Sequence, residues 1–296
     1  MTATVEPPAA EAAESEPAEE HSARNEQIRL LLRSPIFIAG AVIVLFWIVC
    51  AIFGSAIAPH DPYAVDPLHS LQPPSAGHWF GTDDIGRDVL SRVIVGARGI
   101  LIVAPLATVI GTAVGTTLGL ITGYYRGLVD NILSRFIDAF LSLPTVIIAL
   151  LAIVALSTSK IAVILVIAIV FTPIIARTVR AAVLQEREME YLAAAQLRNE
   201  STLYKLFAEI LPNVMGPVLV EFTVRLGYAI FTVATLSFLG FGIQPPAPDW
   251  GLQVFEHYGL VSGGYWWPVL FPALAVASLV IGVNMVADAI AKAFER

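Results

Sequence analysis

Side chains that could carry catalytic chemistry are few in this sequence, and their spacing matches no familiar site. No H-E-x-x-H pair is present to hold zinc, and no paired aspartates lie in an apolar stretch, so an intramembrane hydrolase is not expected. The phosphate loop G-x-x-x-x-G-K-[ST] is also absent, which argues against nucleotide hydrolysis by this chain. The one cysteine, Cys50, has no partner for a disulfide or a thiolate cluster. We therefore predict no enzyme, no metal site and no cofactor in this chain.

One pair of opposite charges lies in a strongly apolar part of the chain. Glu221 and Arg225 are four residues apart, so on a helix they face and neutralise each other. Ionisable groups inside a membrane are costly and usually mark a pathway or a pair. We expect an intramembrane ion pair with a structural role, and the alternative is a direct role in solute passage.

Four glycines recur at intervals of four residues. On a helix this spacing makes a smooth face that lets another backbone approach closely. We expect helix packing at this face, and the alternative is a face that slides or lines a pathway. The four residues are Gly111, Gly115, Gly119 and Gly123.

The elements that must position these residues are membrane-spanning helices. The chain is 57% hydrophobic and only 14% charged, with a mean hydropathy of +0.76, so a soluble fold would have too little polar surface to cover itself. Most of its six uncharged stretches exceed the roughly 18–20 residues that cross a ~30 Å hydrocarbon core as a helix. We predict an all-α membrane protein with six transmembrane helices. The stretches are 36–58, 99–125, 139–159, 161–176, 226–248 and 258–287.

Charge separates a tail from the rest of the chain and sets an orientation. Residues 1–22 are rich in Ala, Pro and Glu and contain no Lys or Arg, so we expect a disordered acidic tail that accounts for most of the net charge of −7. If six spans alternate, most Lys and Arg lie on the side of the two termini, which predicts that both termini are cytoplasmic. The exceptions on the other side are Arg87, Arg92, Arg98 and Lys160.

Two segments between the spans look folded. Residues 59–98 begin with several prolines and end in an apolar stripe, which predicts an external loop followed by an interfacial helix at about 84–98. Its aspartates can pair locally with its arginines, so we expect a folded external clamp rather than a binding site. These residues are Asp83, Asp84, Asp88, Arg87, Arg92 and Arg98. In residues 236–251, glycines and a Pro-Pro pair should stop the fifth helix, with Trp250 at the membrane interface.

The longest cytoplasmic loop, residues 177–213, carries a resemblance. Its Tyr191-Leu-Ala193-Ala194-Ala195 run, followed by Leu211-Pro212, resembles the E-A-A-x-x-x-G…L-P loop of ABC importer permeases. The pattern departs at Ala193, where Glu is usual, and at Asn199, where Gly is usual. The resemblance implies that this loop is the coupling element that binds the ATPase subunit.

Two further runs resemble one subfamily. Residues 80–98, FGTDDIGRDVLSRVIVGAR, closely resemble a signature of dipeptide, oligopeptide and nickel permeases, and include Gly81, Asp83, Gly86, Arg87 and Asp88. Residues 236–251, LSFLGFGIQPPAPDWG, resemble a run of the C-type permease of that family. The chain thus resembles a type I ABC importer permease of the MetI-like fold over about residues 30–296.

The resemblance implies a transport subunit of a bacterial-type cytoplasmic membrane that imports di- or oligopeptides. It implies four kinds of partner besides the lipid bilayer: a homologous second permease, two ABC ATPase subunits that bind ATP and Mg, and an extracytoplasmic peptide-binding protein. Import of nickel chelates or another small solute, and a stand-alone channel or secondary carrier, stay open as alternatives. No basic, aromatic-interleaved surface suggests nucleic acid.

We expect three regions along the chain. Residues 1–22 are the acidic tail. Residues 23–98 hold the cytoplasmic lead-in, the first transmembrane helix and the external loop. Residues 99–296 form a five-helix permease core that contains the coupling loop 177–213.

Overall fold

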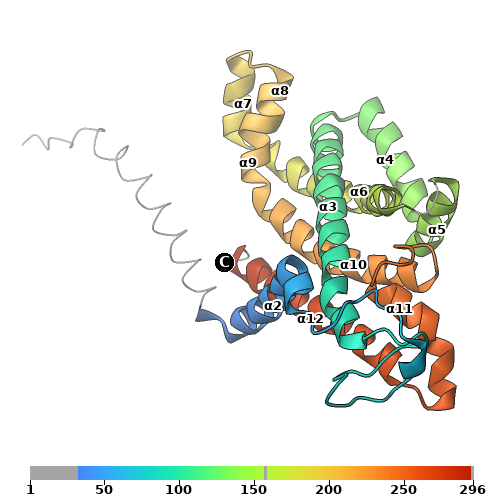
Figure 1. Cartoon of the computed structure of the whole chain (residues 1–296). Helices are drawn as coiled ribbons and strands as arrows, with labels where there is room; N and C mark the ends of the chain where they lie inside the picture. Colours follow the sequence, from blue (N-terminus) through green and yellow to red (C-terminus); the bar gives the residue numbers. More distant parts are fainter. Residues whose placement is uncertain (1–32, 157–158, 295–296) are drawn as a thin grey trace, which may run out of the picture.

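The computed structural model describes residues 33–156 and 159–294, and over these ranges the chain is helical (Figure 1). The acidic tail predicted for residues 1–22 and the start of the 23–98 region lie outside the described residues. Five of the described helices are long and apolar enough to cross a membrane. They are α2 (Pro35–Ile57), α3 (Val89–Tyr124), α6 (Lys160–Glu186), α10 (Met215–Phe238) and α12 (Trp267–Phe294).

Shorter helices connect the spans. A 3-10 turn, η1 (Pro67–His69), lies between α2 and α3, and α4 (Leu128–Leu141) and α5 (Thr145–Leu156) lie between α3 and α6. Between α6 and α10 come α7 (Glu190–Leu197), α8 (Thr202–Tyr204), the π-helical η2 (Lys205–Ile210) and α9 (Leu211–Asn213). The link from α10 to α12 contains α11 (Trp250–His257) and the 3-10 helix η3 (Tyr258–Gly263). The architecture is the predicted all-α membrane fold, with five spans or six if one bent pair counts as a span.

The third predicted span is that bent pair. α4 and α5 meet at an angle of 93° instead of forming one straight helix over 139–159. The break contains Pro144, which has no N–H to donate and disfavours helical backbone at Leu143. Because α4 and α5 together return the chain from the end of α3 to the start of α6, they occupy the place of one span.

The prediction of a separate interfacial helix at about residues 84–98 is wrong. Residues 89–98 are the first turns of α3, which runs unbroken for 36 residues. At 1.5 Å per residue this helix is about 54 Å long, well beyond a ~30 Å hydrocarbon core. Nothing between Arg98 and Gly99 breaks the helix, and the expected boundary between residues 98 and 99 therefore falls inside α3.

The fifth and sixth spans are displaced from the predicted stretches. α10 begins at Met215, eleven residues before the start of stretch 226–248, because its Glu221 and Arg225 neutralise each other within the helix. It ends at Phe238, just before the glycines and prolines of the following turn. The sixth span begins only at Trp267, since the residues before it form η3 and a turn with left-handed backbone at Gly264.

The glycines of α3 lie against α6. A Cβ added to Gly115 would lie 2.8 Å from both the Ile175 Cβ and the Thr172 carbonyl oxygen, and one added to Gly119 would lie 2.6 Å from the Val179 Cβ. Gly111 faces Ala168 and Gly123 faces Val183, so the two helices run parallel. At Gly115, Gly119 and Gly123 the repeat thus lets the backbones approach to a distance that any side chain would prevent.

The first and last spans also pack through glycine. A Cβ on Gly40 of α2 would lie 2.7 Å from the Gly282 carbonyl oxygen of α12. Further along the same contact, the Trp47 indole N–H donates to the Ser278 hydroxyl at 3.0 Å. This indole also packs edge-on against Trp250, with ring centroids 4.7 Å apart.

Trp250 does not lie at the membrane interface as predicted. Its side chain is 1% exposed, and its indole N–H donates to the Val93 carbonyl oxygen of α3 at 2.8 Å. A Cβ on Gly96 would clash with this ring and with the Pro248 carbonyl oxygen. Trp250 is therefore a core residue that fixes α11 against α3.

Replacing Gly115 by Leu should disrupt the contact between α3 and α6. The new side chain would have to displace Ile175 and the α6 backbone, and overpacking of this kind costs about 1–3 kcal/mol of stability. We expect a lower melting temperature and less folded protein in detergent, measured by fluorescence-detected size exclusion.

The matched control is Val114→Leu, since Val114 is 46% exposed on the other side of α3. This change should be mild. Equal losses from both variants would mean that the glycine contact does not determine the fold.

Candidate functional site

The segment 190–213, which we name the hairpin segment, lies beside the C-terminal end of α3. α7, α8 and α9 project there from the helix bundle (Figure 1). The Lys205 ammonium lies 6.0 Å from the Tyr124 ring centroid, which fixes η2 to the end of α3. The hairpin segment joins α6 to α10, so any displacement of it acts on both helices.

The end of α7 explains one departure from the family pattern. Asn199 has a left-handed backbone with φ of 56°. Its N–H donates to the Gln196 carbonyl at 3.0 Å and the Glu200 N–H donates to the Ala195 carbonyl at 3.2 Å, the two hydrogen bonds of a Schellman motif. Glycine adopts this conformation most easily and Asn tolerates it, so the position keeps its structural role.

The alanines of α7 divide between two faces. Ala195 is buried together with Leu192, whereas Ala193 and Ala194 are exposed. The exposed face is therefore small and lacks the carboxylate that the family pattern places at position 193. A partner that contacts it meets a helix surface with little side-chain entropy to lose.

Polar contacts make the hairpin segment rigid. The Tyr191 hydroxyl donates to Glu186 Oε2 of α6 at 2.9 Å. Burial and this carboxylate raise the pKa of Tyr191 to about 12, so the phenol stays protonated and keeps donating. On the opposite arm, Arg198 donates to Glu209 at 2.9 Å.

The chain returns to the spans through a π-turn. Pro212 has no N–H for the helix ladder, and the adjacent η2 turn of Lys205–Ile210 is π-helical. Leu211 is half-buried and Pro212 is exposed. The Asn213 side chain closes this region by donating to the Glu209 carbonyl at 2.7 Å.

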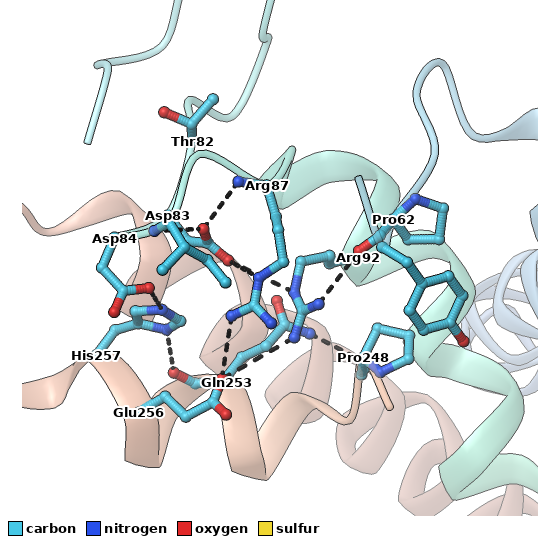
Figure 2. A network of polar contacts seen from close by, with 12 residues as sticks. Pro62, Thr82, Asp83, Asp84, Arg87, Arg92, Pro248, Gln253, Glu256 and His257 are labelled. Carbon is cyan, nitrogen blue, oxygen red and sulfur yellow. Dashed lines mark hydrogen bonds and ion pairs between the residues drawn. The ribbon is translucent and has the colours of Figure 1, made fainter. Parts of the chain in front are cut away.

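A second polar cluster lies at the N-terminal end of α3, in residues 80–98, which we name the clamp segment. Asp83 accepts from the Arg87 N–H at 2.8 Å and from Arg87 Nε at 2.5 Å (Figure 2). Arg92, only 1% exposed, has its Nε 3.8 Å from Asp83 Oδ2. Glu256 of α11 completes the cluster at 3.4 Å from Arg87 and 4.0 Å from Arg92.

Other contacts fix the clamp segment to α11 and α12. His257 Nε2 lies 3.0 Å from Asp84 Oδ1, and the Trp267 indole N–H donates to the Thr82 carbonyl at 2.9 Å. Asp88 caps α3 by accepting from the Ser91 N–H at 2.8 Å. These contacts replace part of the predicted local pairing, in which all three arginines met the three aspartates.

Arg98 differs most from that prediction. It is exposed, and it lines a cavity of about 360 Å³ together with Lys160 and Asp249. Arg98 lies nearly two turns of α3 beyond Arg92 of the Asp83 cluster, and it forms no ion pair with an aspartate of the described residues.

Two glycines of the clamp segment are required by its turns. Gly81 and Gly86 have φ of 74° and 83°. A Cβ on Gly86 would lie 1.8 Å from the Asp66 carbonyl oxygen, and one on Gly81 would lie 2.5 Å from the Gln72 carbonyl oxygen. The loop between α2 and α3 therefore folds directly onto the clamp segment.

Sequence reasoning missed the partners that come from distant parts of the chain. Glu256, His257 and Trp267 lie about 170 residues or more from the groups they contact. Asp130 of α4 was also missed; it accepts two hydrogen bonds from Arg180 of α6, at 2.7 and 2.8 Å. No spacing signal could have revealed contacts that depend on how the helices pack.

Comparison with known proteins decides the family. Residues 115–296 match the family of binding-protein-dependent transport system inner membrane components, and residues 24–74 match the N-terminal transmembrane domain of oligopeptide transport permease C. The chain belongs to the binding-protein-dependent transport permeases. It is therefore a transport subunit of an ABC importer and not itself an enzyme.

Individual relatives of the permease cover nearly its whole length. The Escherichia coli K12 dipeptide transport system permease protein DppC is 39% identical over 87% of this chain and 88% of its own. The Alkalihalophilus pseudofirmus DppC is 35% identical over 91% and 88%, and the Bacillus subtilis oligopeptide permease OppC is 34% identical over 86% and 84%. Among solved structures, an inward-facing MetNI methionine ABC transporter has the same fold, with a TM-score of 0.56, 19% identity, and coverage of 69% of this chain and 97% of that one.

The charged pair of the permease lies in the first half of α10. Arg225 Nε is 2.6 Å from Glu221 Oε1, and the two side chains are 18% and 12% exposed. The Arg225 guanidinium also lies 5.2 Å from the Tyr228 ring centroid, a cation–π distance. Every strong contact of the pair in the described chain is thus within one helix.

Removing one partner of this pair should cost more than removing both. Arg225→Ala leaves the Glu221 carboxylate uncompensated in a region with little water, and breaking a buried pair in this way costs about 3 kcal/mol. We expect a clear fall in folded yield and melting temperature in detergent. Glu221→Ala combined with Arg225→Ala should recover most of the loss.

If the double variant is no more stable than Arg225→Ala, the pair does not stabilise the protein. A double variant that is stable but inactive in uptake would instead assign the charges to solute passage.

Proposed function

We propose that this permease forms part of the path for di- or oligopeptides across a bacterial cytoplasmic membrane and couples it to ATP hydrolysis by partner subunits. The observation that carries this proposal is the hairpin segment, a short rigid surface that projects from the bundle between α6 and α10 (Figure 1). Peptides are the favoured cargo because relatives at 34–39% identity are named for dipeptide or oligopeptide transport.

The partners follow from family membership. We infer a homologous second permease, two ABC ATPases that bind ATP and Mg, and an extracytoplasmic peptide-binding protein. Many large apolar side chains of α2 are exposed, including Val42, Phe46 and Ile52, which suits contact with lipid or with the second permease.

The arrangement of the spans supports a common side for both termini. The start of α2 and the end of α12 lie at the end of the bundle that carries the hairpin segment, since Gly40 contacts Gly282 while the clamp segment contacts Trp267 at the start of α12. Arg126, Arg180 and Arg198 also lie at the hairpin end. The positive-inside rule then makes the hairpin end cytoplasmic.

Two arginines of the opposite end do not argue against this orientation, whereas Arg98 there is exposed. Arg87 and Arg92 are buried and lie against Asp83 and Glu256, so they are neutralised within the protein. Paired charges of this kind constrain orientation less than free cationic side chains do.

Alternating access follows from the connections of the hairpin segment. Force from an ATPase on α7 passes to α6 through Tyr191 and Glu186, and to α10 through α9. The glycine contact then transmits the movement of α6 to α3. In this mechanism the permease supplies the transport path and the hairpin segment that transmits movement, and the partner ATPases supply the energy.

Cysteine labelling tests the proposed orientation. In a Cys50→Ala background, Gln185→Cys should react only from the cytoplasmic side and Gln244→Cys only from outside, because both side chains are exposed at opposite ends of the bundle. Leu68→Cys, 90% exposed in the loop before α3, provides a second outside position. Thr82 is unsuitable because it is fully buried. If Gln185→Cys were labelled only from outside, the orientation would be the opposite of the proposed one.

Charge on the exposed face of α7 should uncouple the permease. Ala194→Glu adds a bulky carboxylate at the centre of the proposed ATPase contact without touching the core, so the protein should fold normally. We expect weaker ATPase binding, and loss of peptide-stimulated ATP hydrolysis and of labelled-dipeptide uptake in proteoliposomes, by tenfold or more.

Glu200→Ala is the control, since Glu200 makes only a 3.5 Å pair with the half-exposed Arg198, and such surface pairs contribute little. It should leave hydrolysis and uptake nearly unchanged. Normal coupling in Ala194→Glu would show that this loop is not the coupling element.

A further inference from the structure

Three potential metal ligands converge beside the clamp segment, where the chain leaves α2 and approaches α3. They are His60, His78 and Asp88, and one ligand atom from each lies within 4.8 Å of the others. His60 Nδ1 is 3.7 Å from Asp88 Oδ2, and His78 Nδ1 is 2.8 Å from Asp88 Oδ1. Their positions in the sequence follow no metal-binding motif, so only the fold brings them together.

The spacing of these atoms suits a small tetrahedral ion. Zinc binds imidazole nitrogen and carboxylate oxygen at about 2.0–2.2 Å, so neighbouring ligand atoms around it lie roughly 3.3 Å apart. The observed separations of 2.8 and 3.7 Å lie on either side of this value. Small side-chain rotations would therefore complete three ligand positions and leave a fourth for water.

Surrounding hydrogen bonds fix two of the three ligand residues. The Asp88 carboxylate accepts from the Ser91 N–H at 2.8 Å and from the Ser91 hydroxyl at 2.7 Å. The same hydroxyl accepts from the His60 backbone N–H at 3.0 Å. Outer contacts that orient ligands are typical of metal sites, and here one serine orients the Asp88 carboxylate and fixes the backbone at His60.

The site is open to solution on one side and buried on the other. The side chain of His60 is 43% exposed and that of His78 is 23% exposed, whereas that of Asp88 is 2% exposed. The imidazole rings lie 4.6 Å apart between centroids. An ion can therefore enter past His60 and meet the buried carboxylate.

A second trio, Asp83, Asp84 and His257, lacks these properties. Arg87 already donates to both oxygens of Asp83, so its cation occupies the position that a metal would need. This contrast makes the His60 trio the candidate among the described residues.

We propose that His60, His78 and Asp88 form a binding site for Zn²⁺ or a similar divalent transition metal. The ion would connect three parts of the chain: His60 just after α2, His78 just before the clamp segment, and Asp88, the N-cap residue of α3. The inference does not depend on the transported solute or on ATP coupling.

Metal titration of the full-length chain in detergent tests the proposal. After treatment with a chelator, the protein is titrated with Zn²⁺ against a chromophoric competitor. We expect one zinc ion per chain, and His60→Ala or His78→Ala should each weaken binding at least tenfold. Cobalt should give the absorption bands of a tetrahedral site in the wild type and not in His60→Ala.

His69→Ala is the matched control, because His69 forms a similar pair with Asp66 at 2.7 Å but belongs to no group of three potential ligands among the described residues. It should bind zinc as the wild type does. Zinc should also raise the melting temperature of the wild type and of His69→Ala, and have no such effect on His78→Ala. Equal zinc affinity in His60→Ala and the wild type, or no binding by the wild type at micromolar zinc, would overturn the proposal.

Discussion

The close approach of α3 to α6 is the contact on which the rest of the structure depends. Four glycines of α3 face α6, and at Gly115, Gly119 and Gly123 no room is left for a Cβ, so the two backbones form one parallel unit. α3 carries the clamp segment at its first turns, and α6 leads directly into the hairpin segment. The glycine contact therefore connects the two polar ends of the protein through its apolar middle, where van der Waals packing is the main attraction available.

Charge is handled differently at the two ends. At the clamp end, Arg87 and Arg92 are buried and share Asp83 and Glu256, which makes a network that is costly to break and ties α3 to α11. At the hairpin end, pairs such as Arg198 and Glu209 are more exposed and individually weak. The clamp end therefore keeps its charges buried, whereas the hairpin end leaves them partly exposed.

The sequence predicted which helices exist better than it predicted where each helix begins and ends. Hydropathy located the spans, because charge is expensive in lipid wherever it is unpaired. The uncharged stretch 226–248 begins well inside α10, although the sequence also predicts the Glu221–Arg225 pair on that helix, and hydropathy split α3 at Arg98, where the helix continues through Gly99. Within the candidate sites, local signals such as the Schellman turn at Asn199 follow from residue type. The positions of Trp250 and Glu256 do not, because they are decided by helix packing across more than 150 residues.

The contact between α2 and α12 has a consequence for synthesis of the protein. Gly40 and Trp47 of α2 leave the ribosome long before their partners Gly282 and Ser278 of α12. Until α12 has been translated and inserted, the Gly40 face of α2 lacks the helix that it packs against in the folded protein. The order of membrane insertion thus differs from the order of assembly, and a chain that stops before α12 leaves Gly40 and Trp47 without these partners.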